Sequence, residues 1–231
     1  GAVPHVVPQM MRNQKNIKAG KEAGCVASCA WGDAAAVIPW TIYLHYGDKN
    51  ILRRQFQNMC GWVDYIKSQD EKDGGARLWR TGFHFADWLA LDNPDKASRF
   101  GGTDNAYIAS AYYLYSAELT AKAAQVLGEK ALYKKYHTLA AEVKTAMQRE
   151  YFTASGRIAI QTQTAMVVAL FMGIVPKEHR SKVVQALCEK LKSNNLHLDT
   201  GFVGTPYLCR VLSDNGANDY AYTLLLNEDY P

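Results

Sequence analysis

The chain has 231 residues, of which 48% are hydrophobic and 21% are charged, a balance that is typical of soluble globular proteins. This composition excludes a disordered chain, which would lack the apolar surface needed to offset the entropy lost on ordering. The net charge of +4 is spread along the sequence, so no basic stripe indicates a nucleic-acid partner. The longest apolar run, residues 165–175, is shorter than the roughly 20 residues of a membrane span.

Residues 1–30 are expected to form an irregular lead-in, because prolines and glycines interrupt a polar stretch and no periodicity survives. No signal-peptide pattern opens the chain. Cys25 and Cys29 stand four positions apart, but no second His or Cys pair follows at metal-ligand spacing. We therefore expect small buried cysteines, and neither a metal nor a cofactor.

The first two helices are predicted over residues 33–46 and 49–68. Asp33 is a candidate N-cap, and Gly47 followed by Asp48 indicates a helix end and a new N-cap. Pro39 lies inside the first helix, so that helix is expected to be kinked or to begin near Pro39. Residues 51–66 carry apolar side chains at steps of three and four, as one buried helix face requires.

Residues 69–103 interrupt the helical pattern with several glycines and an Asn-Pro pair, and they contain Trp79 and Trp88. A loop of this length is uncommon in a compact domain and is more often functional. Helices are then predicted over 104–127, 130–152, 161–172, 177–192, 207–213 and 219–227, with at most a short strand at 157–160. Long helices joined by short turns form antiparallel hairpins, here about four of them.

Two segments place tryptophan beside carboxylate. Trp31 and Asp33 come just before the first helix, with Trp40 two turns later. Flat rings can stack on the apolar face of a sugar, and carboxylates can accept hydrogen bonds from its hydroxyls. The alternative interpretation is structural, with Asp33 as an N-cap and the tryptophans as core residues.

The second segment lies in the long loop, where His84, Asp87 and Trp88 fall within five positions. By itself His84 is better explained as a hydrogen-bonded loop histidine than as a proton shuttle. Residues 197–206 form a third segment, rich in turn formers and hydroxyls. Thr205 is either a helix cap or a residue at the rim of the same site, and the residues alone do not decide between these.

Six stretches of the chain resemble the catalytic domain of bacterial α-L-rhamnosidases, the six-hairpin group of glycoside hydrolase family 78. They occur in the family's order and cover nearly the whole sequence. The stretches are WGDAAAVIPWTIYLHYGD (31–48), FADWLA (85–90), IASAYYLYSAEL (108–119), QTQTAMVVAL (161–170), HLDTGFVGTPYL (197–208) and AYTLLLNEDYP (221–231). The family usually has Gly at the position of Ala86 and Thr at that of Ser110.

The resemblance implies an all-α fold, the (α/α)6 toroid, in which six helical hairpins form two rings. Because the helices predicted above form about four hairpins, we expect residues 1–231 to be the central part of a single (α/α)6 domain. That segment would lack hairpins on one or both sides. A cut toroid exposes hairpin faces, so a homodimer through those faces is an expected outcome.

The resemblance also implies an inverting hydrolase that releases terminal α-L-rhamnose. The family's general acid is a glutamate in a D-x-P-x-R-x-E-R-x-G-W-x-G-D segment, and its general base is a glutamate soon after a YPSW segment. Neither segment occurs in this sequence. We therefore assign no catalytic residue and expect the 231 residues to be inactive alone. The substrate-binding candidates are Trp31, Asp33, Trp40, His84, Asp87, Trp88 and Thr205.

Two alternatives stay open: a noncatalytic helical scaffold that binds carbohydrate or protein, and a six-hairpin glycosidase for another sugar. The localisation also stays open. The cysteine usage favours a reducing compartment, whereas enzymes of the family that this sequence resembles often meet plant glycans in the periplasm or outside the cell.

Overall fold

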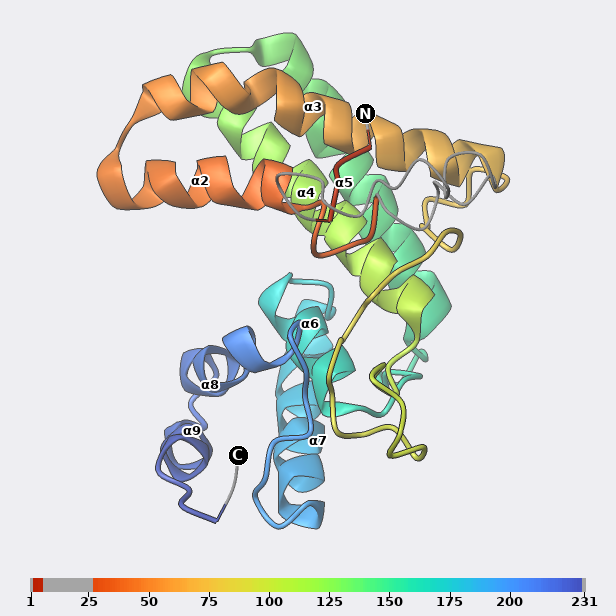
Figure 1. The fold of residues 1–231 in the computed structure, drawn as a ribbon, viewed down its shortest axis with the longest axis vertical. Coiled ribbons are helices and arrows are strands. Elements are labelled where there is room, and N and C mark those ends of the chain that lie inside the picture. The colour runs from red at the N-terminus through yellow and green to blue at the C-terminus, as the bar shows by residue number, and fades with distance from the viewer. Residues whose placement is uncertain (1, 6–26, 230–231) are drawn as a thin grey trace. The chain divides into compact units, whose positions relative to one another are not determined.

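The computed structural model describes residues 2–5 and 27–229. Figure 1 shows its helices, and consecutive helices run side by side in several pairs. In chain order they are α2 (Ala34–Tyr46), α3 (Lys49–Lys72), α4 (Asn105–Leu127), α5 (Lys130–Tyr151), α6 (Gln163–Phe171), the 3-10 turn η2 (Lys177–His179), α7 (Arg180–Ser193), α8 (Thr205–Asp214) and α9 (Asn218–Leu225). The all-α prediction is confirmed.

Most predicted helix ends lie within two or three residues of the observed ones, and α3 runs four residues further, to Lys72. No strand forms at 157–160, the one place where the sequence allowed a short strand, and Ile158 makes only an isolated bridge with Phe152. Most of the irregular lead-in, including Cys25, lies outside the described residues. Among the described residues, no helix has the length and hydropathy needed to cross a bilayer.

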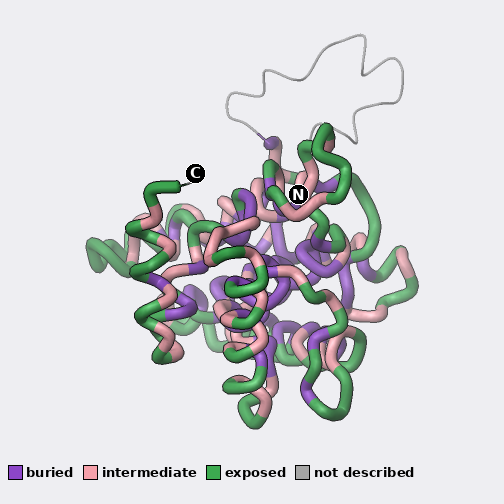
Figure 2. The backbone as a smooth tube through the Cα atoms, turned by 90° about the horizontal axis from the view of Figure 1, so that it is seen from below, coloured by how far each residue is buried: buried purple, intermediate pink, exposed green. Residues whose placement is uncertain are grey.

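The chain divides into two compact units. One contains Gly1–His84 and Tyr112–Ala146, and the other contains Phe85–Ala111 and Met147–Pro231. Helices α4 and α5 contribute residues to both. In the stretch 107–114 of α4, eight successive residues are nearly inaccessible, so this helix has no solvent-facing side there. Figure 2 colours the backbone by burial, and buried, intermediate and exposed residues alternate along much of the described chain.

In the first unit, the turn between α2 and α3 forms as predicted. Gly47 ends α2 with φ 65°, and the Asp48 side chain accepts a hydrogen bond from the Asn50 amide at 2.8 Å. A left-handed residue followed at once by an N-cap reverses the chain within two positions. Helix α2 begins at Ala34, next to the predicted N-cap position Asp33, and continues through Pro39, so the alternative of a start near Pro39 is wrong.

In the second unit, α6 is the central element, because every residue from Gln163 to Leu170 is buried. The Thr162 hydroxyl caps its start by accepting a hydrogen bond from the Ala165 amide at 3.1 Å. The Tyr107 hydroxyl donates to the Ala165 carbonyl at 2.8 Å. Helices α7 and α8 both contact α6, and α9 pairs with α8.

Candidate functional site

The segment before α2 is held through its backbone amides. Four successive N–H groups, from residue 27 to residue 30, donate to the Val3 carbonyl (2.8 Å), His5 Nε2 (3.2 Å), His84 Nδ1 (3.0 Å) and Asp33 Oδ2 (2.8 Å). A stretch whose every amide has a partner has little freedom to rearrange, since each lost bond would leave a buried donor unsatisfied. The backbone that leads into Trp31 is therefore fixed.

The Asp33 carboxylate is completely buried and connects three parts of the first unit. Its Oδ1 accepts from Trp62 Nε1 of α3 at 2.7 Å and from the Ser116 hydroxyl of α4 at 2.5 Å, while Oδ2 accepts from Ala30. Burial raises the pKa of Asp33 to about 6, against the lowering effect of these donors. The side chain does not cap α2, contrary to the N-cap interpretation.

Gly32 explains how Trp62 reaches this carboxylate. A Cβ atom placed on Gly32 would lie 2.6 Å from Cζ2 of the Trp62 indole, closer than carbon atoms can approach. The absence of a side chain lets the ring lie against the backbone, with its N–H aimed at Asp33. The Trp-Gly-Asp sequence thus meets a packing requirement.

His84 is buried and acts as a hydrogen-bond acceptor. Because its Nδ1 accepts from the Cys29 amide, its Nε2 carries the hydrogen and donates to the Thr81 carbonyl at 3.1 Å. Burial lowers the pKa of His84 to about 4, with Thr81 raising it and the charge of His5 lowering it further. The ring is neutral at physiological pH, and Trp79 packs edge-on against it at 4.5 Å.

Trp31 and Trp40 are both partly exposed. Trp31 directly follows the stretch with four bonded amides, and Trp40 lies on α2 beside Tyr43, with ring centroids 5.4 Å apart. Of the first unit's site candidates, these two present aromatic surface to the exterior. The carboxylate and the imidazole lie inside.

In the second unit, the Asp87 carboxylate is 1% exposed and accepts four hydrogen bonds. Its Oδ1 accepts from the amides of Val203 (2.8 Å) and Gly204 (3.1 Å). Its Oδ2 accepts from the Gly201 amide (2.9 Å) and from the Thr164 hydroxyl on α6. The Asp87 side chain thus connects the long loop, the loop before α8 and the start of α6 through hydrogen bonds.

Trp88, the next residue, is partly exposed and stands between Phe85 and Phe100, with ring centroids 5.2 and 5.1 Å away and both contacts edge-on. Its carbonyl accepts from the Phe202 amide at 3.0 Å. Ala86, where the family usually has glycine, adopts φ 49°. This left-handed conformation strains any residue with a Cβ. The surrounding contacts therefore hold Ala86, beside Asp87, in a backbone conformation that alanine disfavours.

Thr205 is exposed and begins α8. Its hydroxyl lies 2.8 Å from that of Thr200, and Gly204 is the N-cap residue, so the proposal that Thr205 caps the helix is not borne out. A Cβ on Gly201 would meet the Ala90 amide nitrogen at 2.6 Å and the Asp87 carbonyl at 2.9 Å. The two loops therefore touch backbone to backbone.

The candidates fall into two local groups, one in each unit: Trp31, Asp33, Trp40 and His84 in the first, and Asp87, Trp88 and Thr205 in the second. The sequence interpretation missed the partners that hold them, namely Trp62, Ser116, Trp79 and Thr164. Trp62 was recognised only as part of the buried face of α3, and isolated hydroxyls on helices carry no distinguishing signal. In the described part of the chain, no three His, Cys, Asp or Glu side chains gather as a metal site would require.

Comparison with known proteins places this geometry in a family. The model for the bacterial alpha-L-rhamnosidase 6 hairpin glycosidase domain matches residues 1–231. The chain belongs to this family. The resemblance inferred from the six stretches is thereby confirmed.

Individual rhamnosidases agree with that assignment. An alpha-L-rhamnosidase of Formosa agariphila is 35% identical over 233 residues, covering 100% of this chain and 23% of that protein. One from Streptomyces avermitilis is 34% identical over 201 residues, covering 87% of this chain and 18% of that protein. The chain thus spans about a fifth of the length of these relatives.

Solved rhamnosidase structures share the fold. The Streptomyces avermitilis alpha-L-rhamnosidase complexed with L-rhamnose matches with a TM-score of 0.78 and 33% identity, covering 88% of this chain and 18% of that one. The Aspergillus terreus alpha-L-rhamnosidase matches with a TM-score of 0.80 and 30% identity, covering 87% and 23%. The helices of this chain therefore follow the six-hairpin arrangement, while closure into a toroid stays a prediction.

Proposed function

We propose that this chain is the central part of a single (α/α)6 domain in an inverting α-L-rhamnosidase, which releases terminal α-L-rhamnose from glycans or glycosides. The observation that carries the proposal is the family match over residues 1–231. It is supported by the 33% identity to a rhamnosidase whose solved structure contains L-rhamnose.

The tryptophans suit a sugar-binding role. Trp31 and Trp88 are partly exposed and directly adjoin backbone that is fixed by hydrogen bonds. Rhamnose has a methyl group where most hexoses have a hydroxymethyl group, so it offers apolar surface to an indole ring. A ring that is already in place loses little conformational entropy when the sugar binds.

The seven binding candidates divide by accessibility. Trp31, Trp88, Trp40 and Thr205 can contact a ligand directly, because each has accessible surface. Asp33, His84 and Asp87 are buried, so their contribution is to position the segments that carry the exposed residues.

Neither buried aspartate serves as the acid or the base. The raised pKa of Asp33, about 6, resembles that of a general acid, but its oxygens are occupied by donors from the protein and have no access to a glycosidic oxygen. Inverting hydrolysis needs an acid and a base about 6.5–9.5 Å apart with a water between them. We therefore propose that the two glutamates come from other parts of the protein and that the 231 residues alone are inactive.

Exposed apolar side chains on the hairpins support a further proposal, that the isolated chain forms a homodimer. Ile38, Leu44 and Tyr46 on α2, and Tyr222 and Leu225 on α9, are each more than half exposed. Apolar surface gathered on one helix is typical of protein interfaces.

The enzymatic proposal is tested by comparing the 231-residue chain with the longer protein encoded by its gene, using p-nitrophenyl α-L-rhamnopyranoside as the substrate. We expect turnover by the longer protein alone, with β-L-rhamnose as the first product by NMR. Trp31→Ala and Trp88→Ala in the longer protein should raise KM more than they lower kcat. Thr153→Ala, on an exposed turn far along the chain from both loops, is the control.

A longer protein without rhamnosidase activity would refute the proposal. Turnover of the corresponding glucoside or mannoside in its place would indicate a six-hairpin glycosidase for another sugar, and rhamnose binding without any turnover would indicate a noncatalytic scaffold. Activity of the 231-residue chain that disappears in Asp33→Asn or Asp87→Asn would refute the assignment of the acid and base to other segments.

A further inference from the structure

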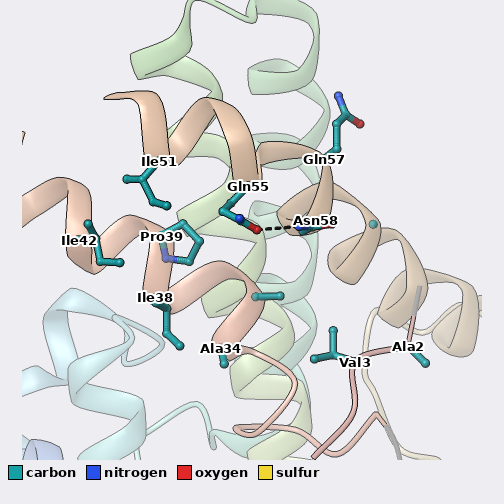
Figure 3. A pocket seen from close by; sticks show the side chains of 12 residues that line it. Ala2, Val3, Ala34, Ile38, Pro39, Ile42, Ile51, Gln55, Gln57 and Asn58 are labelled. Atoms are coloured by element: carbon teal, nitrogen blue, oxygen red, sulfur yellow. Dashed lines mark hydrogen bonds between the residues drawn. The ribbon is translucent and has the colours of Figure 1, made fainter. Parts of the chain in front are cut away.

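Two grooves in the described part of the chain differ in what their walls can recognise. The first, of about 730 Å³, lies beside α2 and α3 in the first unit. Figure 3 shows Pro39 of α2 near Gln55 of α3, which accepts a hydrogen bond from Asn58 at 2.7 Å. No charged residue lines this groove, so its walls favour no particular ligand or partner.

The second groove, of about 660 Å³, lies in the second unit between α7 and the turn that joins α8 to α9. Its volume is within the range of pockets that hold small ligands. Two basic residues line it, and no acidic residue does. The lining consists of Lys177, Arg180, Ser181, Val184, Gln185, Asn215, Gly216, Ala217 and Tyr220.

Arg180 is oriented by the protein but keeps donors for a ligand. Its Nε donates to Asn215 Oδ1 at 2.6 Å, and Asn215 Nδ2 donates to the Val211 carbonyl at 2.6 Å. The bond to Val211 fixes which end of the Asn215 amide faces the guanidinium. Within the described residues Arg180 makes no other hydrogen bond and no ion pair, so four of its five N–H donors stay available.

The charge in this groove is not neutralised by its surroundings. Lys177 makes no ion pair with any described residue. Glu178 lies between the two basic residues in sequence but is exposed and outside the lining, and Glu189 accepts a hydrogen bond from Gln185 at 2.9 Å. An ammonium and a guanidinium in one groove favour an anionic ligand, and the guanidinium fork matches two oxygens of one carboxylate or sulfate group.

The groove is completed by two consecutive hairpins of this chain. Helices α6 and α7 contact each other, as do α8 and α9, and α6 also contacts α8. The groove lies between the second helix of one pair and the turn of the next. In a six-hairpin arrangement a further hairpin packs beyond α8 and α9, so a hairpin that this segment lacks does not fill the space between these two pairs.

We propose that this groove binds an acidic sugar residue, with its carboxylate or sulfate group on Arg180 and Lys177 and its ring beside Tyr220. Ser181 and Gln185 supply polar groups for the sugar hydroxyls. The sugar part of the ligand rests on the proposed function, which makes a glycan the molecule that the protein meets. The preference for an anion rests on the groove alone.

The test is an NMR titration of the ¹⁵N-labelled 231-residue chain with D-glucuronate, D-glucose 6-sulfate and the neutral sugar D-glucose. One or both of the charged sugars should shift the amide signals of residues 177–185 and 215–220, and D-glucose should not. Arg180→Gln should raise the dissociation constant at least about tenfold. Lys182→Gln is the matched control, because it removes the same charge from a lysine that binds the Ser155 carbonyl at 2.8 Å outside the groove; it should change the constant less than about twofold.

Several results would overturn the proposal: binding of D-glucose as tight as that of the charged sugars, equal weakening by the two substitutions, or binding that the longer protein encoded by the gene does not show. Inorganic sulfate that binds as tightly as D-glucose 6-sulfate would overturn the sugar part. Circular dichroism of each variant identifies loss of fold. If Arg180→Gln does not fold, Ser181→Glu decides the matter, because a carboxylate at this exposed lining position should abolish anion binding. None of these measurements depends on turnover, so they separate this proposal from the enzymatic one.

Discussion

Replacing Asp87 by asparagine tests how the second unit is held together. The carboxylate has only acceptor atoms, and four donors point at it. An asparagine side chain has one acceptor oxygen and one donating NH2 group. Its best orientation keeps the oxygen toward Val203 and Gly204 and turns the NH2 toward Thr164, whose hydroxyl can reverse and accept.

In that orientation the Gly201 amide loses its partner and faces another donor. A buried, unsatisfied N–H costs about 1–3 kcal/mol. Two of the surviving bonds also change from charge-assisted to neutral, at about 1 kcal/mol each. The total loss in the free energy of unfolding should therefore be about 3–5 kcal/mol.

The assay is urea unfolding combined with residue-resolved amide hydrogen exchange by NMR. Asp87→Asn should speed exchange at Gly201 far more than at Val203 or Gly204, because only Gly201 is left without an acceptor. Asp64→Asn is the matched control, since Asp64 is 45% exposed in an ion pair with Lys135 and should cost below about 1 kcal/mol. A loss below about 1 kcal/mol in Asp87→Asn, or a Gly201 amide as protected as in the wild type, would refute the reasoning.

Three further predictions concern stability. The pKa of His84 is lowered from 6.5 to about 4, so the stability contributed by its neutral ring is complete above pH 6.5 and is lost as the pH falls toward 4. In urea titrations the stability advantage of wild type over His84→Gln should shrink by about 3 kcal/mol between neutral pH and pH 4; a pH-independent difference would contradict this. Ala86→Gly should raise the free energy of unfolding by about 0.5–1 kcal/mol, and with it the urea midpoint, because it relieves the strain of φ 49°. Ala141→Gly, at an exposed position within α5, should lower the free energy of unfolding by about 1 kcal/mol. Equal effects of the two substitutions would show that Ala86 is unstrained. Gly32→Ala should cost about 1–3 kcal/mol, because the new methyl group would overlap the Trp62 ring, and an unchanged midpoint would show that the ring can withdraw.

The wild-type pH profile alone would conceal the histidine effect. The pKa of Asp33 is raised to about 6, so the folded chain holds a proton there that the unfolded chain has released. That contribution is complete below pH 3.8 and is lost as the pH rises through about 6, opposite in sign to that of His84. Because His84→Gln retains Asp33, the contribution of Asp33 cancels in the difference in stability between wild type and this variant.

The helices were predictable because their signals are local. The reversal at Gly47 and Asp48 depends on two adjacent residues, and the buried face of α3 follows from spacing alone. The effect of Pro39 on α2 was less predictable. On local grounds Pro39 allowed either a kink or a later start, whereas the helix begins at Ala34, next to Asp33, whose hydrogen-bond partners come from distant parts of the chain.

The sequence singled out the candidate site residues, but it did not predict what their side chains contact. A loop aspartate close to a tryptophan is compatible with a sugar-binding carboxylate and with an internal hydrogen-bond acceptor, and the choice depends on how many donors of the protein reach the carboxylate. Those donors are Trp62 and Ser116 for Asp33, and backbone amides more than a hundred positions away for Asp87. Neither set is visible in the local sequence.

The Trp31-Gly32-Asp33 segment shows how packing and hydrogen bonding can hold a candidate binding residue in place. Asp33 binds the Ala30 amide and side chains of α3 and α4, which fixes the backbone on both sides of Trp31. Gly32 is required because Trp62 occupies the space of its side chain. Only Trp31 has surface left for a ligand. Two of the three residues are therefore set by packing and hydrogen bonding, and their effect is to hold the third in place.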